Sequence, residues 1–184
     1  IIRAAKKPLL ICGGGVRYSF AGDALDAFCR QTGIPFSETQ AGKGTLPWDH
    51  AHNLGGIGVT GGQAANIIAK EADLIIAVGT RLTDFTTCSK WLFHKNAQVL
   101  SINICAFDAI KMLGTPIIAD ARESLTALTG ALDGYHTAWG DAPAQAKAAW
   151  NKQVDAFYTM EEKDGLPQTR ALGEINAFMQ PSDI

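Results

Sequence analysis

The stretch from Ala72 to Asp84 constrains the fold of this chain more than any other segment. Its apolar run, Leu74 to Val78, is followed at once by Gly79-Thr80-Arg81. A short run that is apolar on both faces and bounded by turn residues is typical of a strand buried on both sides of a sheet. Such strands belong to parallel α/β sheets, where ligands bind just beyond the carboxyl ends of the strands. Gly79-Thr80-Arg81 is therefore the first candidate for a binding site.

The rest of the chain alternates strand-like and helix-like segments, as a parallel sheet requires. Apolar runs predict further strands at residues 8–12, 34–38, 98–104 and 116–120, with another candidate at 53–56. Helical spacing predicts helices at 21–33, 61–72, 107–113 and 121–132, whereas 82–95 is expected to be a loop. This order predicts an α/β fold, namely a doubly wound, Rossmann-like parallel sheet of five or six strands flanked by helices.

The pattern changes after Asp133. A loop-like stretch leads into helical segments at 144–158 and 168–179, and no strand is available for these helices to cover. We therefore expect a first domain at 1–133, a linker with a helix at 134–165, and the start of a further domain at 166–184, so that the sheet carries a helical C-terminal extension. Because the chain starts at Ile1 without methionine and ends at Ile184, we expect a fragment of a longer protein.

Composition excludes several classes of function. The net charge is −2, which gives no reason to expect nucleic acid or an anionic membrane as partner. No apolar run approaches the roughly 20 residues of a membrane-spanning helix. The cysteines form no Cys-x-x-Cys pair, so a zinc site is not expected. Cys12 and Cys29 are expected to be small buried hydrophobic residues, which fits a reducing, cytoplasmic setting.

Two features could belong to a nucleotide or a metal site. Gly13-Gly14-Gly15 follows the first strand like half of a dinucleotide fingerprint, with Glu38 about where a ribose-binding carboxylate would lie, but Tyr18 replaces the third glycine. Close packing of helix on sheet explains these glycines better. His50 and His52 lie beside Asp49, where solvated or packing roles are favoured over a metal site because no other His or Cys is near in sequence.

Two basic residues are candidates for contacts with a ligand. Lys43 lies between two glycines, and a contact with an anionic ligand and an ordinary exposed position are about equally expected. Arg81 follows the central strand directly, so its head should face the crevice at the strand ends. Pairing with Asp84 is the simpler, structural role for Arg81 and is slightly favoured.

Several segments resemble the central domain of thiamine-diphosphate enzymes, a family that includes the acetohydroxyacid synthases. The matching segments are 7–15, 33–35, 54–58 and 72–81. Within that family, 38–44, 55–61 and 79–87 resemble the trihydroxycyclohexane-1,2-dione hydrolases of myo-inositol catabolism. Residues 168–176 resemble the start of the diphosphate-binding domain of the same enzymes.

The resemblance implies a three-domain hydrolase that uses thiamine diphosphate and magnesium. It would break a C–C bond and open the ring of a small cyclic diketone, trihydroxycyclohexane-1,2-dione, to a deoxyglucuronate. The glutamate that activates the cofactor lies in the first domain, and the Gly-Asp-Gly…Asn motif for magnesium and diphosphate lies in the third. The resemblance therefore implies no catalytic or metal-binding residue in this chain, and a fragment that is inactive alone.

The resemblance also implies partners and contact residues. The partners are the enzyme's other two domains and further copies of the subunit in a homodimer or homotetramer. Gln40 and Lys43 are the candidates for residues that face the substrate. Some relatives bind FAD or ADP on this domain, and the matching groove residues here are Gly14, Gly15, Gly58, Thr60, Gly79, Thr80 and Arg81, with Asp84, Asn103 and Asp120 beside them.

One departure from the family pattern argues against FAD. The relatives that use FAD carry Asp-Ile-Asp after the fourth strand, where this chain has Asn103-Ile104-Cys105. The loss of both carboxylates removes acceptors for a ribose or an adenine edge, so the groove is expected to be vestigial. The alternative is a non-catalytic module that binds a nucleotide (FAD, ADP or NAD), or a subunit interface, in another thiamine-diphosphate enzyme such as an acetohydroxyacid synthase relative.

Overall fold

The computed structural model describes residues 1–180 and 182–183 of the chain. It divides into two compact units, the first spanning Ile1–Lys147 and the second beginning at Ala148. Over the described residues, no helix is both long and apolar enough to cross a bilayer.

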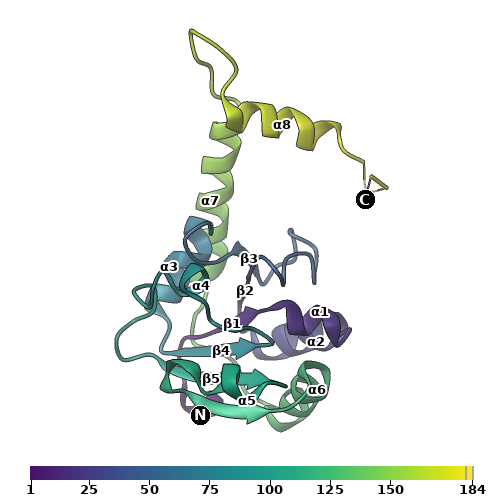
Figure 1. The fold of residues 1–184 in the computed structure, drawn as a ribbon, viewed down its shortest axis with the longest axis vertical. Coiled ribbons are helices and arrows are strands. Elements are labelled where there is room, and N and C mark those ends of the chain that lie inside the picture. The colour runs from purple at the N-terminus through teal and green to yellow at the C-terminus, as the bar shows by residue number, and fades with distance from the viewer. Residues whose placement is uncertain (181, 184) are drawn as a thin grey trace. The chain divides into compact units, whose positions relative to one another are not determined.

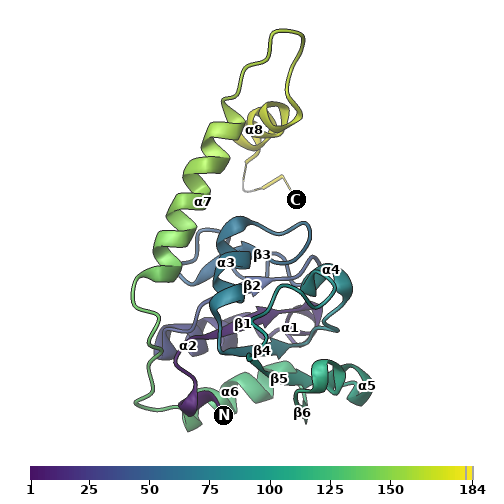
Figure 2. The same cartoon turned by 90° about the vertical axis from the view of Figure 1, so that its left-hand side faces the viewer.

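A parallel sheet forms the centre of the first unit (Figure 1). Its strands are β1 (Pro8–Cys12), β2 (Phe36–Glu38), β3 (Asn53–Gly56), β4 (Leu74–Val78), β5 (Gln98–Asn103) and β6 (Thr115–Ile118). They lie in the order β3-β2-β1-β4-β5-β6, which Figure 2 shows from one side of the sheet. All the pairings are parallel. The predicted doubly wound, Rossmann-like sheet is thus confirmed, and its sixth strand is the candidate at 53–56.

Helices cover both faces of this sheet. The elements of the first unit are η1 (Ile2–Ala4), α1 (Gly14–Tyr18), α2 (Gly22–Thr32), α3 (Gln63–Glu71), α4 (Asp84–Thr87), α5 (Ala106–Ala109), η2 (Lys111–Leu113), α6 (Ala121–Ala131) and the first part of α7 (Ala142–Tyr158). In Figure 1, α2 and α6 lie on one side of the sheet and α3 lies on the other. Gly33 caps the C-terminal end of α2 in the left-handed conformation, with φ of +69°.

Two hydrophobic cores result from the alternation of side chains along the strands. Leu10, Ile76 and Ile102 face the core under α2 and α6, where Phe28 and Leu125 pack. The intervening residues Ile11, Ile75 and Ala77 face the core that contains Ile68 of α3. Because β1 and β4 are buried on both faces, their sequences are apolar throughout, and their predicted bounds are confirmed to the residue.

Two elements differ from the sequence-based expectation. The apolar run at 116–120 was expected to be a strand; β6 spans Thr115–Ile118 and is an edge strand that is mostly exposed. The predicted loop at 82–95 contains the short helix α4, whose N-cap Thr83 accepts a hydrogen bond from the backbone N–H of Thr86. A four-residue helix has too little periodicity to be found from sequence.

The segment after α6 is fastened to the start of β1. The indole Nε1 of Trp139 donates to the carbonyl of Pro8 at 2.8 Å, and the Tyr135 hydroxyl donates to the carbonyl of Ala5 at 3.1 Å. Lys147, on α7, donates to the carbonyls of Trp48 and His50 at 3.2 and 2.8 Å. The first compact unit therefore extends past the predicted domain boundary at Asp133, to Lys147.

The second unit consists of the rest of α7, a loop and α8 (Gln168–Phe178). The predicted helix at 168–179 is confirmed within one residue. Arg170 of α8 forms two ion pairs, with Nη1 lying 3.5 Å from Glu161 Oε1 and Nε lying 3.9 Å from Glu174 Oε1. The apolar side chains Leu172, Ile175 and Phe178 of α8 are exposed.

Candidate functional site

The candidate site lies where the strand order reverses, between β1 and β4. The turns after these strands are in direct backbone contact, because Gly13 N donates to Val78 O and Gly15 N donates to Gly79 O, both at 2.9 Å. A Cβ atom added to Gly79 would lie 2.6 Å from the Cα of Gly15, and the φ of Gly79 is +60°. Gly15 and Gly79 are thus required for close packing of the two turns. For the glycines at 13–15, the sequence also favoured a packing role over a nucleotide site. The same packing leaves a crevice at the carboxyl edge of the sheet, where doubly wound folds bind ligands.

A cavity of about 800 Å³ occupies this crevice. Most of the residues predicted from sequence line it: Gly14, Gly15, Gln40, Thr60, Gly79, Thr80, Arg81, Asn103 and Asp120. Gly58, Lys43 and Asp84 are not among the lining residues. Gly58 instead lies behind the wall, where its N–H donates to Asn66 Oδ1 at 3.0 Å.

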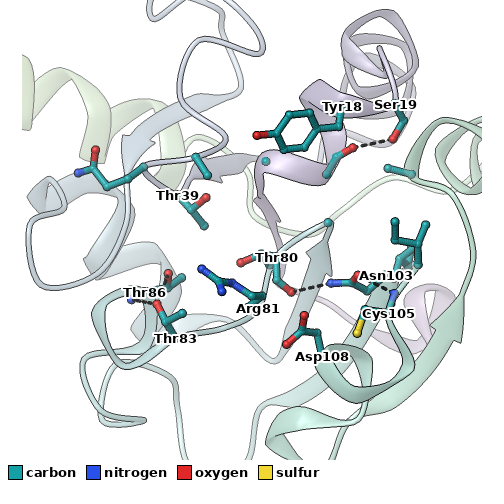
Figure 3. A pocket seen from close by; sticks show the side chains of 18 of the residues that line it. Tyr18, Ser19, Thr39, Thr80, Arg81, Thr83, Thr86, Asn103, Cys105 and Asp108 are labelled. Atoms are coloured by element: carbon teal, nitrogen blue, oxygen red, sulfur yellow. Dashed lines mark hydrogen bonds between the residues drawn. The ribbon is translucent and has the colours of Figure 1, made fainter.

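Arg81 and a group of threonines form one end of the cavity. Figure 3 shows the Arg81 side chain extending into the cavity between Thr80 and the pair Thr83 and Thr86. Within the described part of the chain, the Arg81 guanidinium has neither a hydrogen bond nor an ion pair, and Asp84 does not pair with it. The favoured structural role for Arg81, an ion pair with Asp84, was therefore wrong, whereas the expected orientation toward the crevice is correct.

Asn103 connects the ends of β4 and β5. Its Nδ2 donates to the carbonyl of Thr80 at 3.1 Å, and its Oδ1 accepts from the backbone N–H of Cys105 at 3.0 Å (Figure 3). An aspartate could accept the second bond but could not donate the first. Asn103 therefore holds the two loops at a fixed spacing.

Glu38, at the end of β2, does not reach the cavity. The residue is only 3% exposed, and its Oε1 accepts from the backbone N–H of Gly44 at 3.1 Å. Burial raises the pKa of this carboxyl, while hydrogen bonds from the Asn53 side chain and the Gly44 N–H oppose the shift. The carboxylate holds the 39–45 loop, so the ribose-binding position of a dinucleotide site is taken by a structural interaction.

The two predicted substrate-facing residues lie at different places on this loop. Gln40 lines the cavity and donates from Nε2 to Thr60 Oγ1 at 3.2 Å. Lys43 is exposed, outside the cavity, and its carbonyl accepts from Arg17 Nη1 at 3.1 Å. The structure therefore brings Gln40 together with the groove residues and leaves Lys43 apart from them.

The histidine cluster has packing partners. His50 Nε2 lies 2.7 Å from Asp26 Oδ1, and His50 Nδ1 accepts from the backbone N–H of His52 at 3.2 Å. The contact with His50 holds the pKa of Asp26 below its usual value, although burial opposes the shift. Across the described residues, no group of three or more His, Cys, Asp or Glu side chains could hold a metal ion.

The cysteines fit the packing role that the sequence indicated. Cys12 and Cys29 are fully buried. Burial raises the pKa of the Cys12 thiol to about 12 and raises that of Cys29 well above its usual value, so both remain protonated thiols.

Several cavity residues were missed by the sequence reasoning. They include the hydroxyl groups of Thr39, Thr83 and Thr86 and the apolar side chains of Tyr18, Phe85 and Ile104. Tyr18, Phe85 and Ile104 are 87%, 69% and 77% exposed, so they form an apolar rim. Thr83 and Thr86 follow Gly79-Thr80-Arg81 closely and could have been suspected from that proximity. Thr39 directly follows the strand predicted at 34–38, so the rule that pointed to Gly79-Thr80-Arg81 could have pointed to it as well.

The strand order and the cavity at its switch point define the class of protein: a doubly wound α/β domain with a ligand groove at the carboxyl edge of its sheet. Residues 1–128 match the family model described as the central domain of thiamine pyrophosphate enzymes. The chain therefore belongs to the thiamine pyrophosphate enzyme family, by its central domain.

The chain is also similar to curated proteins named 3D-(3,5/4)-trihydroxycyclohexane-1,2-dione hydrolase. That of Geobacillus thermodenitrificans is 55% identical over 84% of this chain and 24% of the relative. Those of Clostridium tetani and Bacillus cereus AH820 are 43% and 48% identical over all of this chain and 33% of each relative. The chain thus spans a third or less of the length of these relatives.

The fit of the family's cofactors can be judged from the residues present. Magnesium needs oxygen ligands, which are usually clustered carboxylates together with phosphate oxygens, and a diphosphate needs hydrogen-bond donors or cations. The described residues offer no such cluster of acidic side chains, and the sequence lacks Gly-Asp-Gly. The two positions that matched ribose acceptors are used within the chain, because Glu38 Oε1 accepts from Gly44 N and Asn103 bridges Thr80 O and Cys105 N. The described residues therefore offer no carboxylate cluster for magnesium, and a ribose in the cavity would have Asp108 and Asp120 as its acceptors.

Proposed function

We propose that this chain is the central domain of a thiamine-diphosphate-dependent C–C bond hydrolase that opens the ring of trihydroxycyclohexane-1,2-dione to a deoxyglucuronate in cytoplasmic inositol catabolism. The observation that carries the proposal is the identity of 43% and 48% over the whole chain with relatives that bear this enzyme's name. Thiamine diphosphate and magnesium would bind outside this chain, on the neighbouring domains of a homodimer or homotetramer.

In this proposal the chain supports catalysis without performing it. The domains are 1–133 (central), 134–165 (linker with helix) and 166–184 (start of the diphosphate-binding domain). Gln40 and Lys43, on the 39–45 loop, are the residues proposed to face the substrate. The groove residues Gly14, Gly15, Gly58, Thr60, Gly79, Thr80 and Arg81 descend from a nucleotide site.

The test has two arms. The enzyme encoded by the complete reading frame is expected to open the ring in the presence of thiamine diphosphate and magnesium. The 184-residue chain alone is expected to show no turnover and no heat of binding for thiamine diphosphate with magnesium. A complete enzyme that leaves this diketone intact would refute the activity, and tight cofactor binding by the chain alone would refute the domain assignment.

A second candidate, a nucleotide-binding module, is favoured by the cavity at the switch point and the glycine turn beside it. Such a module predicts a rise in melting temperature with FAD, ADP or NAD. A ligand at 100 times its dissociation constant would add about 2.7 kcal/mol to the free energy of unfolding. A melting temperature that no nucleotide changes would dismiss this candidate.

A role as a subunit interface is favoured by apolar side chains near the β6 edge. Ile104, Phe107 and Leu113 are 77%, 71% and 101% exposed. Sedimentation of the chain tests this role, and a strict monomer at high concentration counts against it.

A further inference from the structure

The Arg81 end of the cavity contains hydrogen-bond donors that lack acceptors. Three threonine hydroxyls on its wall each act as acceptors: Thr39 from Gly42 N at 3.2 Å, Thr60 from Gln40 Nε2 at 3.2 Å, and Thr80 from Leu82 N at 3.4 Å. Each hydroxyl also has one proton to donate. In the part of the chain that the structure describes, none of these protons has an acceptor. Thr39 and Thr80 are 8% and 7% exposed, so water satisfies them only in part.

Arg81 adds to this excess. Its guanidinium carries five N–H donors and no acceptor. Among the described residues, the guanidinium forms no hydrogen bond or ion pair, and the exposed side chain extends into the cavity beside Thr80 (Figure 3). A ligand that complements this end must therefore supply oxygen acceptors and negative charge.

The acceptors elsewhere on the cavity wall are partly committed. Asp120 Oδ1 accepts from the backbone N–H groups of Arg122 and Glu123 at 2.8 and 3.2 Å. Asp108 Oδ1 accepts from Lys111 Nζ at 2.7 Å. The second carboxylate oxygen of each remains available for hydroxyl donors of a ligand. The cavity thus combines one end rich in donors with carboxylates on the β5 and β6 side.

The charges indicate which oxyanion fits. Arg81 is the one cation among the described lining residues, which also include Asp108 and Asp120. A phosphate monoester, with nearly two negative charges, would meet two carboxylates and a single guanidinium. A carboxylate carries one charge and matches a guanidinium through two parallel hydrogen bonds. A nucleotide is further disfavoured because Glu38, the carboxylate at the end of β2, is buried and bonded to Gly44 N.

We propose that the Arg81 end of this cavity binds a small hydroxylated carboxylic acid. Its carboxylate accepts from Arg81 and from the hydroxyls of Thr39 and Thr80, and its own hydroxyls donate to Asp108 or Asp120. The proposal goes beyond the proposed function, which assigns the groove no occupant, and it holds whichever reaction the complete enzyme performs.

Calorimetric titration of the 184-residue chain with matched probes tests the proposal. D-Gluconate carries both the carboxylate and the hydroxyls, D-sorbitol lacks the carboxylate, and acetate lacks the hydroxyls. Inorganic phosphate and ADP provide the competing oxyanions. We expect gluconate to bind at millimolar concentrations or below, acetate more weakly, and sorbitol not at all. Tighter binding of phosphate or ADP than of gluconate would overturn the proposal, as would no binding of gluconate.

Variants locate the site. R81Q should weaken gluconate binding by at least about tenfold. R81K, which keeps the charge but loses the planar fork, should fall between R81Q and the original chain. R122Q removes an equal charge from an exposed position outside the cavity lining and should leave the affinity unchanged. Equal affinities in R81Q and the original chain, with melting curves that show both folded, would contradict the assignment. These binding experiments need no turnover. Absence of gluconate binding would therefore refute this proposal even if the complete enzyme is an active hydrolase, and an inactive complete enzyme would leave the binding result unaffected.

Discussion

Gly79 and Gly15 hold the two turns of the switch point closer together than any side chain would permit. Gly79 has a φ of +60°, and its Cα lies so close to the backbone of Gly15 that a methyl group on Gly79 would not fit. Positive φ alone disfavours residues with a Cβ. The residue therefore sets the geometry of the cavity floor before any ligand is considered.

G79A should destabilise the fold by about 2–4 kcal/mol, because strain at φ and a clash with Gly15 add together. The midpoint of urea unfolding measures the loss. Gly130, exposed in α6 with no atom within 4 Å of its would-be Cβ, supplies the matched control. G130A should be neutral or stabilise by up to about 1 kcal/mol. Equal effects of the two variants would contradict the packing argument.

Glu38 should make stability depend on pH. Its folded pKa is raised by burial, so the unfolded chain ionises first as the pH rises. The stability that Glu38 contributes is fully present below the ordinary glutamate pKa and is lost as the pH rises through the folded value. E38Q should therefore gain stability relative to the original chain between about pH 4 and about pH 7. Urea midpoints across that range check this, with E123Q, at an exposed position, as the control. Parallel profiles for E38Q and the original chain would contradict it.

At the scale of helices and strands, the local sequence specifies a buried strand well but does not specify where in the sheet a strand lies. β1 and β4 were predicted to the residue, because a strand buried on both faces must be apolar throughout. β6 has a similar apolar sequence but is exposed, since burial depends on its position at the edge of the sheet. The cavity residues divide in the same way. Gly79, Thr80 and Arg81 follow a recognisable strand, and so does Thr39, whereas Tyr18 and Phe85 lie in the short helices α1 and α4, which the local sequence did not predict.

Trp139 fastens the segment after α6 to β1. Its ring is 4% exposed, Lys7 Nζ lies 4.9 Å from the ring centroid, and Nε1 donates to Pro8 O. W139F keeps most of the apolar contact but loses the donor, so it should cost about 1 kcal/mol. W139A should cost about 3–5 kcal/mol. Thermal or urea unfolding measures both. Trp91 is 87% exposed, and W91F should stay within about 0.5 kcal/mol of the original chain.

At the scale of the whole molecule, the first compact unit ends at Lys147, whereas the first predicted domain ends at residue 133. The sequence pattern changes at Asp133, because no strand follows the helix α6, which ends at Ala131. The folded unit continues to Lys147, because Tyr135, Trp139 and Lys147 form hydrogen bonds with residues near β1 and β3. Such long-range bonds leave no signal in local periodicity.

Truncation separates the two boundaries. A chain that ends at Tyr158 retains every residue of the first unit and should unfold within about 1 kcal/mol of the full chain. A chain that ends at Asp133 loses the buried Trp139 and should be destabilised by about 3 kcal/mol or more. Urea unfolding monitored by far-ultraviolet circular dichroism compares them. Equal stability of the two truncated chains would show that the segment after Asp133 contributes nothing.

The exposed edge of the sheet has a consequence for assembly. Ala119 N donates to Asn103 O, so alternate residues of β6 point their backbone groups toward β5, and Pro116 points outward. Proline has no N–H to donate, and at an edge it discourages the addition of another strand. Addition of a strand is thereby disfavoured at the β6 edge, even though Ile118 and its apolar neighbours lie open to solvent. A molecule that binds at the β6 edge must therefore contact side chains instead of adding a strand. Such a contact depends on the complementary shape of one partner and does not extend the sheet from molecule to molecule.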